Sequence, residues 1–114
     1  MTRLTDRVAD QGGHLTVGAL ATELGEPEDQ VLVVLGLTTS GHPASAAKTQ
    51  HRLREVVEIL ERTEPWAGSL DAAWHWYVTT PIPALSDTPA ALVRSGRADE
   101  VLLYIEHIAD GGYA

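Results

Sequence analysis

Apolar residues recur at helical spacing along most of the chain, and capping residues, glycines and prolines separate the segments. The longest periodic segment runs from about residue 46 to residue 63. Four of its apolar residues fall at positions i, i+3, i+4 and i+7: Leu53, Val56, Val57 and Leu60. This spacing puts them on one stripe of an α-helix, so we expect a long helix whose stripe is buried.

Three shorter helices are predicted to follow the long one. Ser69 is a good N-cap for a helix that runs to Thr79, and the prolines that start at Pro81 end it. Thr88 is a cap followed by a proline at the first helical position, and this short helix stops at a glycine. The last predicted helix covers Ala98–Ala109 and ends at a pair of glycines.

Residues 1–45 carry the pattern of a helix-turn-helix. A first helix is predicted at Leu4–Gln11, followed by a second helix and by a third that opens with proline and acidic residues. A small residue, a glycine and an apolar residue occur at the spacing that this motif requires: Ala21, Gly25 and Val31. After a loop at residues 38–45, residues 46–114 form the linking helix and a C-terminal helical domain. The predicted fold class is therefore all-α.

The apolar segment Val31–Leu35 admits two interpretations. Its short length and its β-branched residues fit a buried strand, whereas the capping signals in front of it favour a helix. A helix that is apolar on every side is buried or paired with another surface. A homodimer contact at this segment is therefore one alternative.

Composition places the chain among small globular proteins. It has 114 residues, of which 44% are apolar and 21% charged. It contains no cysteine, which excludes disulfides and thiolate metal sites. Its longest apolar run is too short to span a bilayer, and its first residues lack an apolar signal core. We expect a cytoplasmic protein without a membrane partner.

The charge of the chain lowers the expectation of DNA binding. The chain has 8 basic and 16 acidic residues, a net charge of -8, and phosphate attraction requires lysine and arginine. The front of the third helix offers Glu28 and Asp29 where a DNA reader needs basic or amide side chains. The one basic cluster, on the long helix, is either a solvated face or a phosphate contact. Four residues are candidates for weak DNA binding: Gln30, Lys48, Arg52 and Arg54.

Catalytic and metal-binding patterns are absent from the sequence. No two of the five histidines are four residues apart, and no serine lies in a glycine elbow. The glycine pairs lack the further glycines of a phosphate loop. We therefore expect no enzymatic activity and no cofactor.

The last 45 or so residues contain an ordered set of motifs. A tryptophan-bearing helix is followed by a proline turn, with Trp76, Pro81 and Leu85 at the marked positions. T-P-A-A-L-V-R-S-G follows at residues 88–96, and V-L-L-Y-I-E-H-I-A-D-G-G-Y-A runs over residues 101–114. In this order, the motifs resemble the toxin-binding domain of the Xre/MbcA/ParS antitoxin family.

The resemblance implies an antitoxin of a type II toxin-antitoxin system. Such proteins bind and neutralise a cognate toxin, commonly of the RES-domain type that acts on NAD, and their C-terminal part covers the entrance of the toxin's active site. Family members with a helix-turn-helix also bind their own promoter, as homodimers or larger assemblies. Two alternatives are a helix-turn-helix transcriptional regulator without a toxin partner and a stand-alone oligomerisation module.

The candidate toxin-binding residues lie on the last helix and on the tail after it. The acidic residues of this helix and the terminal carboxylate resemble an anionic dinucleotide, which a basic cleft would accept. An exposed leucine and a tyrosine behind two glycines are suited to anchor a partner. The candidates are Arg97, Leu103, His107, Gly111, Gly112, Tyr113 and Ala114.

Overall fold

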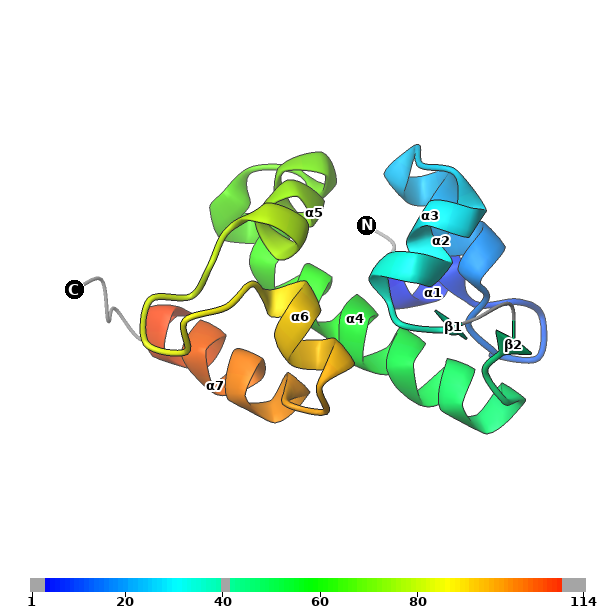
Figure 1. Cartoon of the computed structure of the whole chain (residues 1–114). Helices are drawn as coiled ribbons and strands as arrows, with labels where there is room; N and C mark the ends of the chain where they lie inside the picture. Colours follow the sequence, from blue (N-terminus) through cyan, green and yellow to red (C-terminus); the bar gives the residue numbers. More distant parts are fainter. Residues whose placement is uncertain (1–3, 40–41, 110–114) are drawn as a thin grey trace.

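The computed structural model describes residues 4–39 and 42–109, and about two thirds of these residues are helical. Seven helices occur among these residues, together with one pair of two-residue strands (Figure 1). The helices are α1 (Leu4–Val8), α2 (Val17–Leu24), α3 (Glu28–Val34), α4 (Ala46–Ala67), α5 (Leu70–Thr79), α6 (Pro89–Arg94) and α7 (Ala98–Ala109). The strands are β1 (Thr38–Thr39) and β2 (His42–Pro43). The predicted all-α class is confirmed.

The N-terminal helices differ from the prediction in two places. Helix α1 ends at Val8 and does not reach Gln11, because the carboxylate of Asp10 accepts hydrogen bonds from the amides of Gly12 and His14 and closes a turn there. The predicted loop at residues 38–45 contains the antiparallel pair of β1 and β2. The segment after Pro27 is helical, so the strand interpretation of Val31–Leu35 is wrong.

Helix α2 has the ends that its sequence predicts. The hydroxyl of Thr16 accepts a hydrogen bond from the amide of Ala19 at 3.1 Å, which satisfies one free donor of the first turn. Gly25 ends the helix in the left-handed conformation. Helix α2 packs on both α1 and α3, and α1 also packs on α4.

The long helix α4 supports both halves of the molecule. Its four-residue stripe is buried, as predicted, and α4 packs against α1, α5 and α7. It continues beyond residue 63, where the predicted segment ends, and runs through Pro65, because a proline near the end of a helix removes only one hydrogen bond. It ends at Gly68, which has a φ of +99° and donates to the carbonyl of Glu64.

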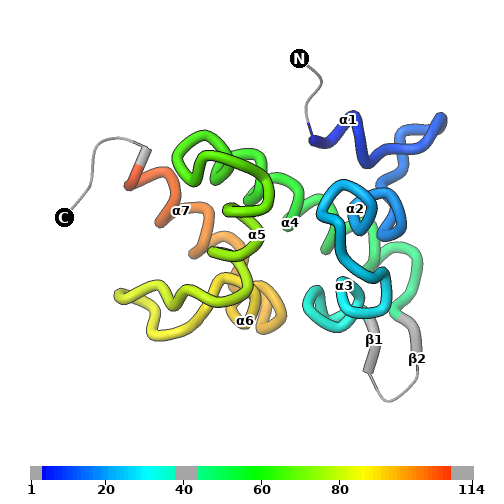
Figure 2. The backbone as a smooth tube through the Cα atoms, turned by 90° about the horizontal axis from the view of Figure 1, so that it is seen from above, coloured from blue at the N-terminus to red at the C-terminus, as the bar shows by residue number. Residues whose placement is uncertain are grey.

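The last three helices form the half of the molecule on the other side of α4 (Figures 1 and 2). The predicted caps are present, since Ser69 accepts from the amide of Ala72 and Thr88 from that of Ala91. Helix α5 packs on α4 and α6, while α7 packs on α4 and α6. This arrangement turns one side of α7 toward the core and the other side outward.

Two arginines join the halves at the C-terminal end of α3. Arg52 of α4 donates to the carbonyl of Leu35 at 2.5 Å, and Arg94 of α6 donates to the carbonyl of Val34 at 3.0 Å. Gly36 follows with a φ of +72°, and a Cβ at this position would lie 3.0 Å from a side-chain atom of Arg94. We call this contact of Arg52 and Arg94 with the end of α3 the arginine junction.

Candidate functional site

The outer face of α7 is the best-defined part of the predicted toxin-binding site. Val101 and Ile105 are buried on the core side of the helix. Leu103 points the other way and is 67% exposed, and His107, one turn further along α7, is also exposed. The predicted exposure of Leu103 is therefore correct. An exposed leucine among charged side chains offers a partner one apolar anchor at the centre of a polar surface.

Charged residues on α7 are partly paired. Arg97 donates two hydrogen bonds to the carboxylate of Glu100, at 2.5 and 3.0 Å, and these bonds hold the pKa of Glu100 below its usual range. Glu106 accepts from Arg62 of α4 at 3.2 Å, while Asp99 is exposed. These pairs cancel part of the negative charge, so the net charge of this surface is less negative than the number of its carboxylates suggests.

The remaining predicted toxin-binding residues follow this helix. Gly111, Gly112, Tyr113 and Ala114, together with the acidic residue Asp110, lie outside the described residues. The structure therefore gives the exposure and pairing of the helix face, and the toxin-binding role of both parts stays a prediction.

The predicted basic cluster on α4 is not one surface. Arg52 is only 8% exposed, and its guanidinium is occupied by the carbonyl of Leu35 and the carboxylate of Glu55. Its prediction as a solvent-facing cation was wrong, because the sequence does not show which carbonyls approach it. Lys48 and Arg54 are exposed, but they lie six residues apart and therefore point about 120° away from each other around the helix.

The predicted DNA-reading end of α3 is acidic in the structure as well. Glu28, Asp29 and Gln30 are all exposed there. With Arg52 buried, few cations remain that could contact phosphate groups near this helix. The predicted weakness of DNA binding stays a prediction.

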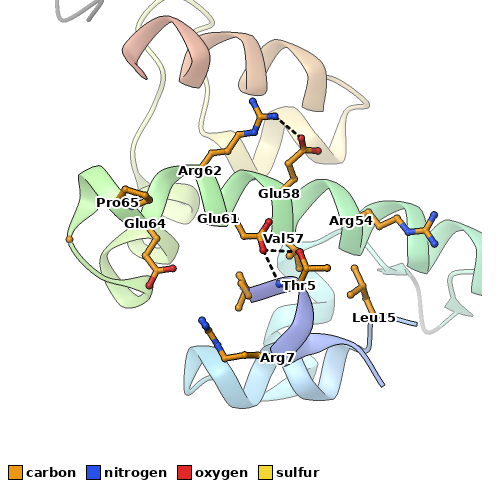
Figure 3. Close-up of a pocket in the computed structure, with 12 residues that line it drawn as sticks. Thr5, Arg7, Leu15, Arg54, Val57, Glu58, Glu61, Arg62, Glu64 and Pro65 are labelled. Carbon is orange, nitrogen blue, oxygen red and sulfur yellow. Dashed lines mark hydrogen bonds and ion pairs between the residues drawn. The ribbon is translucent and has the colours of Figure 1, made fainter. Parts of the chain in front are cut away.

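A groove that the sequence did not predict lies between α1 and α4, with a volume of about 820 Å³ (Figure 3). Its charged lining is balanced, with three arginines (Arg7, Arg54 and Arg62) and three glutamates (Glu58, Glu61 and Glu64). Glu61 accepts two hydrogen bonds from Thr5, at 2.9 and 2.8 Å, and Glu58 accepts from Arg62 at 3.0 Å. The bonds from Thr5 to Glu61 fasten α1 to α4, and the balance of charge in the lining selects no class of ligand.

Within residues 4–39 and 42–109, no three histidine, aspartate or glutamate side chains come close enough to hold a metal ion. None of the helices described is both long and apolar enough to cross a membrane. No protein-family model, no curated protein and no solved structure matches the chain. Its function therefore has to be argued from its own residues.

Proposed function

We propose that this protein is an antitoxin that binds and neutralises a cognate toxin with its C-terminal helices. The observation that carries the proposal is the outer face of α7, where Leu103 is exposed beside His107 and the Arg97–Glu100 pair. The order of α5, proline turn, α6 and α7 is the order that the resemblance to the Xre/MbcA/ParS family implies. The resemblance implies a RES-domain toxin that consumes NAD as the partner.

The proposed mechanism is steric cover of the toxin's substrate entrance. A cleft that accepts the anionic NAD molecule is expected to be basic, and an acidic protein is attracted to it. Leu103 would fill an apolar depression beside the entrance, with the exposed carboxylate of Asp99 facing a cation at its rim. The tail from Gly111 to Ala114 would enter the cleft, with its tyrosine as a second anchor.

Neutralisation in cells tests this proposal with matched surface variants. The toxin tested is the product of the adjacent gene, which the proposal expects to be a RES-domain protein, and growth is measured while both proteins are expressed. Leu103→Asp should abolish growth rescue and binding to the purified toxin, because a carboxylate replaces the apolar anchor. Val33→Asp is the control, since Val33 is 61% exposed on α3 in the other half of the molecule.

Two outcomes would contradict the proposal. If no stable complex with the RES-domain protein forms, the chain is not its antitoxin. If Val33→Asp abolishes rescue and Leu103→Asp does not, the toxin contact lies on α3. A third variant that lacks residues 111–114 separates the two parts of the site: it should keep the fold and its melting temperature but neutralise less well.

DNA binding is the alternative function, as a transcriptional regulator or as autoregulation of the antitoxin's own operon. The acidic front of α3 and the burial of Arg52 weigh against a dedicated regulator. We propose that any binding is weak, falls steeply with salt and depends on Lys48 and Arg54. A tight, sequence-specific complex with DNA at physiological salt that survives Lys48→Ala and Arg54→Ala would exclude this view.

We also propose a cytoplasmic location, where such toxins act, and assembly as a homodimer on DNA.

A further inference from the structure

A second groove, of about 740 Å³, lies between the two halves of the molecule. One wall is the end of α2, the turn after it and three residues of α3 (Gln30, Val31 and Val34), and the other wall is α5. Figure 2 looks down on this region, with α5 on one side and α2 and α3 on the other. We call it the α2–α5 groove. All of its lining belongs to residues 22–34 and 71–79, which the structure describes.

The charge of the α2–α5 groove is negative. Glu23, Glu26 and Asp71 line it, together with His75, and neither a lysine nor an arginine belongs to the described lining. Glu23 is paired with Arg7 at 3.3 Å, but Glu26 and Asp71 are exposed and form no ion pair with a described residue. Two carboxylates without an ion pair among the described residues thus line the groove, one from α5 and one from the turn after α2. Nucleic acid and anionic lipid would be repelled from such a surface.

The floor of the α2–α5 groove is apolar. Trp74 lies there with Val34 and Val78, and the indole stacks on the ring of Tyr77 with 5.5 Å between ring centroids. The indole is therefore held in a fixed orientation by the core. Trp74 is 9% exposed, so its indole offers the groove a small apolar contact. A long aliphatic side chain could lie along this contact and along Val34 and Val78, with a cation at its end near the carboxylates of the lining.

We propose that the α2–α5 groove binds an arginine-bearing segment of a partner protein. The arginine stem lies on the Trp74 floor, and the guanidinium donates to the carboxylates of Glu26 and Asp71. Arginine fits better than lysine because its planar fork serves two carboxylates at once and stacks on aromatic rings. A bound segment would also cover Gln30, which lines the same groove, so that this partner and DNA would compete for the front of α3.

This inference does not rest on the antitoxin proposal, and it is tested with a defined probe. The probe is an acetylated and amidated pentapeptide with arginine at its second and fifth positions and leucine or alanine elsewhere. Titration of the full ¹⁵N-labelled chain should give saturable shifts of the amides on α5 and around Gly25. The same peptide with citrulline in place of arginine keeps the shape and removes the charge, and it should not bind.

Two double variants distinguish binding of the peptide in the groove from a general attraction of the cationic peptide to an acidic protein. Glu26→Gln with Asp71→Asn should weaken binding by about tenfold or more, since each charge-assisted hydrogen bond contributes about that much. Asp6→Asn with Asp99→Asn makes the same change in net charge at two exposed residues outside the groove, and should weaken binding less than about twofold.

Three results would overturn the inference. They are the absence of saturable shifts at millimolar peptide, equal weakening in the two double variants, and equal binding of the citrulline peptide. Sedimentation of the chain alone provides a further check. If the chain self-associates and Glu26→Gln with Asp71→Asn abolishes this association, the occupant of the groove is a second copy of the chain and the inference fails.

Discussion

Replacing Tyr77 by phenylalanine should raise the free energy of unfolding, because it removes a buried hydroxyl that has no hydrogen-bond partner among the described residues. The ring of Tyr77 is fully buried beside the arginine junction. Burial raises its pKa well above the usual value, although the nearby charges of Arg52 and Arg94 act in the opposite direction. Desolvation of the hydroxyl is therefore the dominant effect at this position.

The size of the effect follows from the geometry. A buried polar group without a partner costs about 1–3 kcal/mol, and Tyr77→Phe removes this cost. The ring itself stays, and with it the stacking on Trp74, so no cavity term opposes the gain. For a chain of this length, each kcal/mol corresponds to roughly 4 °C in melting temperature. We expect a melting temperature that is higher by about 4–12 °C.

Urea and thermal unfolding followed by far-UV circular dichroism measure this change. Tyr104→Phe is the matched control, because Tyr104 is only partly buried and its hydroxyl can be hydrated. The control should change the free energy of unfolding by less than about 0.5 kcal/mol. A lower urea midpoint for Tyr77→Phe at unchanged m-value would refute the reasoning, since it would show that the hydroxyl is hydrogen-bonded in solution.

Three further changes test the packing. Leu60→Ala should lower the free energy of unfolding by about 2–5 kcal/mol in urea melts, because Leu60 is fully buried; a loss below about 0.5 kcal/mol would contradict its place in the core. Gly36→Ala should also lower the free energy of unfolding, by about 1 kcal/mol or more, because Gly36 has a positive φ and the new Cβ would contact Arg94. Gly25→Ala is the control and should cost less, because its positive φ adds strain but the new Cβ contacts nothing. Glu100→Gln should lower the melting temperature at neutral pH but not in acid. The pKa of Glu100 is lower in the folded state than in the unfolded state. The stability from its pair with Arg97 is therefore present above the unfolded-state pKa and is lost as the pH falls through the folded-state pKa.

Helix starts and the buried stripe of α4 could be predicted because their signals are local. Ser69 and Thr88 cap amides only three residues away, and the stripe follows from the helical repeat alone. Leu103 belongs to the same class, since its position on α7 puts it opposite Val101 and Ile105. The candidate face of α7 was thus accessible to sequence reasoning.

Features set by residues distant in the sequence could not be predicted. Arg52 is buried because the carbonyl of Leu35, 17 residues earlier, lies against it, and no local pattern marks that approach. The same holds for Arg94 and the carbonyl of Val34, which are 60 residues apart. The α2–α5 groove is also of this kind, because its walls come from segments about 50 residues apart and meet only in the fold.

The arginine junction changes the role that α3 can play. The carbonyls at the end of a helix carry partial negative charge, and two guanidiniums from α4 and α6 satisfy them here. Helix α3 is thereby fixed to both halves of the molecule, with its acidic front beside the α2–α5 groove. A helix that is held at its C-terminal end and acidic at its N-terminal end is poorly suited to enter a DNA groove. It is better suited to form one wall of a protein-binding surface, because the junction holds its C-terminal end against α4 and α6.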